Sequence, residues 1–111
     1  MSARVPSFDP QRAPRRDSGA SIFQRELMGE AVAALARVGR EVEAALHQLR
    51  ALDRAEDPDR YVTQQYVCAD AVWRYFVQRE MCGLMRHEPV IEAYAIPREV
   101  LTKVGAKPPR R

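Results

Sequence analysis

Glu80 is the side chain of this sequence best placed for chemistry. At 100° per residue it falls within one helical stripe of apolar residues, Val62, Tyr66, Ala69, Trp73, Phe76 and Leu84. A buried carboxylate needs a partner or a proton. We expect an ion pair with Arg79 or Arg86 of a partner chain, or with Arg25. The alternative is a small-ligand or metal site around Glu80 in the core of a helical bundle.

Other metal-ligating and nucleophilic residues lack the spacing of a site. Di-metal bundles use Glu-x-x-His motifs, but Gly83 stands three residues after Glu80. Glu43 and His47 lie on a predicted outer face, and the ligand types near the end of the second predicted helix scatter around it: Met81, Cys82, Met85 and His87. There is no phosphate loop, nucleophile elbow or histidine triad. We predict no catalytic residue, no metal and no cofactor.

The two cysteines are expected to stay reduced. Cys68 and Cys82 are 14 residues apart in one predicted helix, about 21 Å along its axis. A disulfide requires Cα atoms within about 7 Å. We therefore interpret both as packing residues.

The positive charge of the chain lies in its two ends. The formal net charge is +3, yet residues 1–20 carry +2, residues 103–111 carry +4, and residues 21–102 carry −3. A nucleic-acid-binding fold usually shows a basic face. Nucleic-acid contact is therefore a weak alternative, confined to the cations Arg12, Arg15, Arg16, Lys103, Lys107, Arg110 and Arg111.

Two long helices position these residues. From residue 28 the apolar positions step by three and four: Met28, Ala31, Leu35, Val38, Val42, Ala45, Leu49 and Leu52. This spacing predicts a helix with a knobs-into-holes face, opened at a Ser21 capping box. Asp57-Pro58 predicts the start of a second helix, 58–85. Their matched lengths and short loop predict an antiparallel hairpin.

Two short helices are expected after Gly83, each opened by a proline, at 89–94 and 97–104. Helices this short need docking, and their apolar residues should pack onto one end of the hairpin. Residues 1–20, with three prolines, predict a disordered basic tail, 21–106 a single helical domain, and 107–111 a basic C-terminal tail.

The second helix has more apolar surface than one neighbour can cover. A weaker stripe, Cys68, Ala71, Tyr75 and Cys82, accompanies the Trp73 stripe. Exposed apolar patches of this extent usually mark an interface. We predict an all-α protein that dimerises into a four-helix bundle. The candidate dimer interface is Val62, Tyr66, Ala69, Trp73, Phe76 and Glu80.

A resemblance to a known family rests on two stretches of the sequence. They are residues 71–80, AVWRYFVQRE, and residues 94–105, with Tyr94-x-Ile96-Pro97-x-Glu99-Val100-Leu101 and Gly105. Together with Gly29-Glu30 and Gly39-Arg40, they make residues 21–106 similar to a family of short uncharacterised alphaproteobacterial proteins, a domain of unknown function. The resemblance implies a bacterial origin. It implies no activity, cofactor or site residue.

A non-enzymatic, homodimeric interaction or scaffold protein is the function that these observations favour. Nucleic-acid binding through basic tails and a ligand or metal site around Glu80 remain the alternatives. No apolar run approaches the roughly 18 residues of a membrane span, and the N-terminus has no signal-peptide pattern. We therefore expect a cytoplasmic protein that does not enter a membrane.

Overall fold

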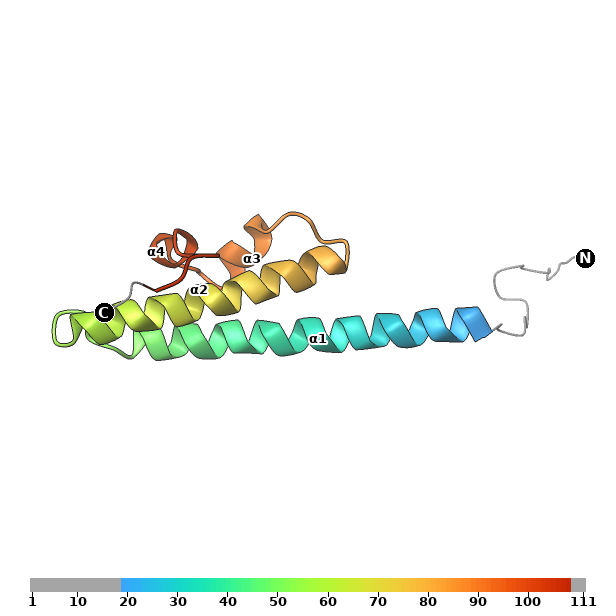
Figure 1. Ribbon diagram of the computed structural model, residues 1–111, viewed down its shortest axis with the longest axis horizontal. Helices are drawn as coiled ribbons and strands as arrows, with labels where there is room; N and C mark the ends of the chain where they lie inside the picture. The colour runs from blue at the N-terminus through green and yellow to red at the C-terminus, as the bar shows by residue number, and fades with distance from the viewer. Residues whose placement is uncertain (1–18, 109–111) are drawn as a thin grey trace, which may run out of the picture. The chain divides into compact units, whose positions relative to one another are not determined.

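The computed structural model describes residues 19–108, and this range is helical without any strand. It contains α1 (Gly19–Arg50), α2 (Pro58–Met81), α3 (Glu88–Ala93) and α4 (Arg98–Leu101), drawn in Figure 1. The prediction of an all-α fold is confirmed. The predicted tail 1–20 lies outside the described residues except for Gly19 and Ala20, which are helical. Residues 109–111 of the second predicted tail also lie outside them.

The chain divides into two compact units, Met1–Glu30 and Ala31–Arg111. The described part of the first unit is helical throughout. Ser21 lies inside α1, two residues after the first described helical residue. The prediction that Ser21 begins the helix is therefore wrong.

The start of α2 is the one predicted. The Asp57 side chain accepts a hydrogen bond from the Arg60 backbone N–H (3.2 Å), and Pro58 occupies the first helical position. Proline is suited to that position because its missing N–H would have no partner inside the helix.

α2 ends at Met81, four residues before the predicted end at Met85. Gly83 adopts a left-handed conformation with φ +87°. Its N–H donates to the Glu80 carbonyl, and the Leu84 N–H donates to the Arg79 carbonyl, both at 2.9 Å. These two bonds make a Schellman motif, which turns the chain out of the helix. Glycine allows it without the penalty that a Cβ brings.

α1 and α2 pack together within the second unit, where Figure 1 shows them side by side. The Ala45 carbonyl of α1 accepts bonds from the Gln64 amide (3.1 Å) and the Cys68 thiol (3.2 Å) of α2. Arg74 bridges the helices by pairing with Glu41. The α2 stripe that faces α1 is therefore the weaker one predicted, with Cys68, Ala71 and Tyr75 buried.

The C-terminal helices complete the core. Ile96 and Val100 are buried, and the partly buried side chains Val90, Ile91, Tyr94, Leu101 and Val104 pack against the same cluster. α4 contacts α2. These apolar residues pack into the same core as α1 and α2, as predicted, while their placement at one end of a hairpin stays a prediction. The core combines three parts of the chain: Val42, Ala45, Leu46 and Leu49 of α1, Cys68, Ala69, Ala71, Val72 and Tyr75 of α2, and this C-terminal pair.

A close contact joins the end of α3 to α1. A Cβ on the buried Gly39 would lie 3.0 Å from the Tyr94 hydroxyl oxygen. Arg50 Nη2 donates to the carbonyls of Tyr94 and Ala95, at 3.1 Å each. Ala95 holds a left-handed φ of +53°, which costs a non-glycine residue about 1 kcal/mol. The Arg50 contacts hold the chain in this turn.

Candidate functional site

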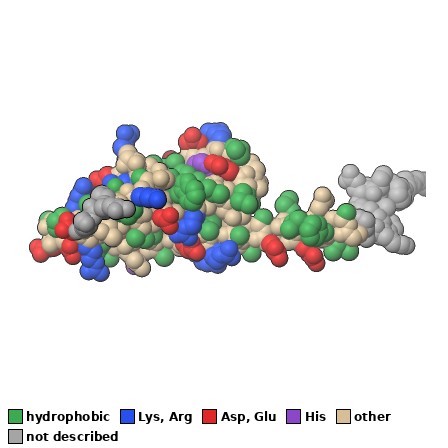
Figure 2. All heavy atoms as spheres, viewed as in Figure 1, with side chains coloured by type: hydrophobic (Ala, Val, Ile, Leu, Met, Phe, Trp, Pro, Cys, Tyr) green, Lys and Arg blue, Asp and Glu red, His purple; other side chains and the backbone are tan. Residues whose placement is uncertain are grey.

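The apolar face predicted on α2 is divided between core and surface. Ala69 is buried in the chain's own core, and Tyr66 and Phe76 are half-buried. Val62 and Trp73 remain 40% and 48% exposed. Figure 2 shows apolar side chains at the surface over α2. Part of the surface expected to need a partner is therefore covered by the chain itself.

The cover comes from the segment after α2. The His87 ring stacks on Phe76 with centroids 4.1 Å apart. Lys103 Nζ lies 5.6 Å from the Tyr66 ring centroid, in a cation–π contact. A Cβ on Gly105 would lie 4.0 Å from Trp73 Cδ1, so the chain at Gly105 passes beside the indole. Trp73 is the aromatic side chain of this face that is least covered.

Glu80 is partly exposed in the single chain. Its side chain is 46% exposed, and Oε2 lies 2.8 Å from His87 Nε2. Within the chain its hydrogen-bond partner is therefore a histidine seven residues later. α1 covers the stripe of Cys68 and Tyr75, while the segment after α2 contacts the Trp73 stripe. The ion pair expected with Arg79 or Arg86 of a second chain stays a prediction.

The hydrogen on the His87 ring is fixed by an arginine. Arg79, only 9% exposed, donates from Nε to His87 Nδ1 at 3.2 Å and from Nη2 to the Arg86 carbonyl. Arginine Nε always carries its hydrogen, so Nδ1 must accept. The ring hydrogen is then on Nε2, where it is donated to Glu80. This cluster ties the turn after α2 back onto the helix.

The predicted soft ligands do not converge on one point. Met81 and Met85 are 74% and 66% exposed, and the Cys82 thiol points to the Ala31 carbonyl at 3.9 Å. Glu43 and His47 both lie on the exposed surface of α1. Within residues 19–108, no three His, Cys, Asp or Glu side chains are grouped as metal ligands.

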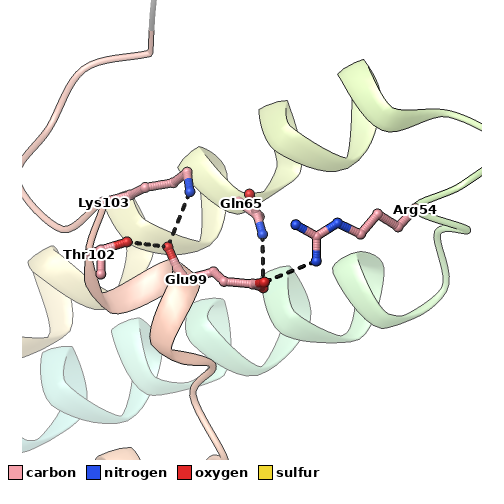
Figure 3. A network of polar contacts seen from close by, with 5 residues as sticks. All are labelled: Arg54, Gln65, Glu99, Thr102 and Lys103. Atoms are coloured by element: carbon pink, nitrogen blue, oxygen red, sulfur yellow. Dashed lines mark hydrogen bonds and ion pairs between the residues drawn. The ribbon is translucent and has the colours of Figure 1, made fainter.

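A second polar cluster, which the sequence analysis missed, centres on Glu99 (Figure 3). Glu99 Oε1 accepts from Gln65 Nε2 at 3.1 Å, and Oε2 accepts from Arg54 Nη1 at 2.9 Å. The Glu99 carbonyl accepts from Thr102 Oγ1 (2.9 Å) and Lys103 Nζ (3.3 Å). One carboxylate thus links α4, α2 and the loop before α2. The feature of the sequence that could have indicated this cluster is Gln65, a polar residue between the apolar turns of Tyr61 and Ala69.

The Glu99 cluster is a structural tie. Gln65 is 2% exposed, and a buried amide requires hydrogen bonds. Both carboxylate oxygens are already engaged by protein donors. Glu99 therefore offers no carboxylate oxygen that is prepared for a substrate.

The two thiols differ in their surroundings. Cys68 is fully buried, and burial raises the pKa of its thiol to about 11, against the lesser opposing effects of Arg50 and Gln64. Cys82 is partly exposed. The thiolate is the nucleophile, so Cys68 is an inert packing residue in the folded chain.

We expect this raised pKa to make stability depend on alkaline pH. The stabilising effect of the protonated Cys68 is complete below pH 9 and is lost as pH rises toward 11, because the unfolded thiol ionises first. The slope is at most about 1.4 kcal/mol per pH unit. Urea unfolding between pH 8 and pH 11 should show a flatter profile for Cys68→Ala than for the wild type. Cys82→Ser, the control, should keep the wild-type slope; equal slopes in all three proteins would contradict the pKa shift.

The cations considered for nucleic-acid contact are only partly described. Lys103 is engaged by Glu99 and Tyr66, while Lys107 is exposed. Arg12, Arg15, Arg16, Arg110 and Arg111 lie outside the described residues. No basic face is assembled from this set within residues 19–108.

A shallow cavity of about 330 Å³ lies where α1 meets the loop and α2, lined by Gln48, Ala51, Leu52, Arg60 and Gln64. The Gln64 amide already donates to Ala45, which leaves Arg60 as the charged group of the lining. Binding pockets usually combine enclosure with several converging polar groups, and this cavity is open to solvent. No helix among the described residues has the length and apolar character needed to cross a membrane.

Comparison with known proteins places the chain in a family. Neither the curated proteins nor the solved structures contain a significant match to it. A family model does match, over residues 1–110, and its description is a family of unknown function. This agrees with the predicted resemblance to a domain of unknown function, and the described residues are helical. Because the match covers residues 1–110, the chain belongs to the family of unknown function DUF6665.

Proposed function

We propose that this protein is a non-enzymatic helical interaction protein that works as a homodimer. In this proposal α1 and α2 act as a helical hairpin, and the hairpins of two chains pair into a bundle of four long helices. The polar clusters around Glu80 and Glu99 are internal ties and perform no chemistry. The protein acts through the surfaces that it presents to other chains.

One observation supports the proposal above all others. Large apolar side chains at least 36% exposed occur on both long helices and in the turn after α2: Ile22, Phe23, Leu27, Met28, Val32, Val62, Val67, Trp73, Val77, Met81, Leu84 and Met85. Single exposed apolar residues are ordinary, but contiguous patches of them mark interaction sites. Trp73, Val77 and Met81 follow one another at four-residue steps on α2, so they form a ridge suited to helix packing.

The oligomeric state tests the proposal directly. Sedimentation velocity of the full chain between 1 and 100 µM should show a dimer of twice the 12.7 kDa chain mass. The apparent melting temperature should rise with concentration, because dimerisation stabilises the folded state by mass action. A single monomeric species at every concentration, with a concentration-independent melting temperature, would refute the proposal.

A further inference from the structure

The apolar side chains of the first unit have the character of a pairing surface. Within its described part, Gly19–Glu30, the exposed fractions are 43% for Ile22, 60% for Phe23, 49% for Leu27 and 68% for Met28. Figure 2 shows apolar side chains at the surface of this stretch. We call these four residues the α1 apolar surface.

The chemistry of the surface selects the class of partner. Gly19–Glu30 contains one cation, Arg25, and two anions, Glu26 and Glu30. Helices that bind anionic membranes or nucleic acid are rich in lysine and arginine. A net charge of −1 with both signs present is compatible with a second copy of the same surface. The partner that fits is therefore another protein helix.

The size of the surface is comparable to the apolar part of a dimer interface. At 100° per residue, Phe23, Leu27 and Met28 lie within about 140° of one another, while Ile22 lies outside this arc. At about 200 Å² for a fully exposed large side chain, those three present roughly 350 Å² at their observed exposures. A standard interface buries about 800 Å² per partner, of which about 57%, about 450 Å², is apolar.

The α2 face is less suited to this role. Ala69 is buried in the core, and the chain's own Lys103, His87 and Gly105 contact Tyr66, Phe76 and Trp73. The exposed fractions of Val62, Trp73 and Val77, 36% to 48%, are lower than those of Phe23 and Met28, and only Met81 at the end of α2, at 74%, exceeds them. The chain has thus partly covered α2 by itself.

We infer that the α1 apolar surface pairs with the same surface of a second copy, as a two-fold interface centred near Leu27 and Met28. A two-fold dimer uses the same patch on both chains, so every side chain of the patch counts twice. This inference rests on the proposed homodimer and assigns its interface to α1 rather than to the α2 face.

Paired glutamine variants of the full chain test the assignment. Phe23→Gln with Met28→Gln should raise the dimer dissociation constant about 100-fold or more by sedimentation, because four buried apolar side chains are lost per dimer. The matched control, Trp73→Gln with Val77→Gln, should change it by less than about threefold. All substituted side chains are exposed, so far-UV circular dichroism should remain that of the wild type. Phe23→Leu with Met28→Leu should retain the dimer.

The possible outcomes separate this inference from the proposed function. Dissociation by the Trp73 and Val77 pair, with the Phe23 and Met28 pair still dimeric, would overturn the α1 assignment and leave self-association standing. A monomeric wild type at 100 µM would overturn both. If such a monomer cosedimented with anionic phosphatidylserine vesicles, and the Phe23→Gln, Met28→Gln variant did not, the surface would be a membrane-binding surface instead.

Discussion

Replacing Glu99 with alanine is expected to lower the free energy of unfolding by about 2–3 kcal/mol. The substitution leaves the Gln65 amide, 2% exposed, without the acceptor that Glu99 Oε1 provides at 3.1 Å. An unsatisfied buried polar group costs about 1–3 kcal/mol. The link between α4 and α2 is lost with it. Urea unfolding followed by circular dichroism measures the change.

Two controls separate the buried bond from the exposed ion pair. Arg54→Ala removes the partner of Glu99 Oε2, and both side chains of that pair are largely exposed, at 62% and 44%. Exposed pairs contribute at most about 1 kcal/mol, so this variant should be mild. Glu99→Gln keeps an acceptor for Gln65 and should fall between the two. If Arg54→Ala lowered the free energy of unfolding as much as Glu99→Ala, the loss of the acceptor for the Gln65 amide would not be the main cause of the destabilisation.

Replacing Gly39 with leucine is expected to destabilise the fold by up to about 2 kcal/mol. A Cβ there would already lie 3.0 Å from the Tyr94 hydroxyl oxygen and 3.5 Å from Tyr75 Cε1, and leucine adds further carbons to the same space. Forced overpacking costs about 1–3 kcal/mol. The helix-propensity gain of about 1 kcal/mol over glycine offsets part of this cost. Thermal and urea unfolding measure the outcome.

Gly29, another glycine within α1, provides the matched control. Gly29 has no atom within 4 Å of a built Cβ, so Gly29→Leu should leave stability unchanged or raise it by up to about 1 kcal/mol. In a Tyr94→Ala background the cost of Gly39→Leu should drop to below about 1 kcal/mol, because the obstructing ring is gone. An undiminished cost in that background would place the clash elsewhere.

Local sequence chemistry predicted that the helices exist and where α2 begins, although not the start of α1 or the end of α2. The three–four spacing of α1 identified the face that is buried from Val42 to Leu49, because one period of the helix determines which residues share a side. Asp57 and Pro58 identified the start of α2 because capping depends on adjacent residues alone. The apolar residues between Val90 and Val104 identified a docked C-terminal segment.

The surroundings of the candidate site residues could not be read from one helix, because they depend on which face is covered. Glu80 was predicted in an apolar stripe, and within the single chain its side chain is 46% exposed. Its partner His87 follows the Gly83 turn, whose path cannot be read from the periodicity of α2. Gln65 and Glu99 were missed because they are 34 residues apart and meet only when α4 packs on α2.

The sequence by itself determined the all-α class, the order of the helices and the residues that share each helical face, since these depend on interactions within a few residues. Only the tertiary structure decided which α2 stripe faces α1 and which one the C-terminal segment partly covers. The physical reason is that α2 carries two apolar stripes, and periodicity alone does not determine which of them α1 covers. The choice between them depends on contacts between distant residues, such as Cys68 with Ala45 and Glu99 with Gln65.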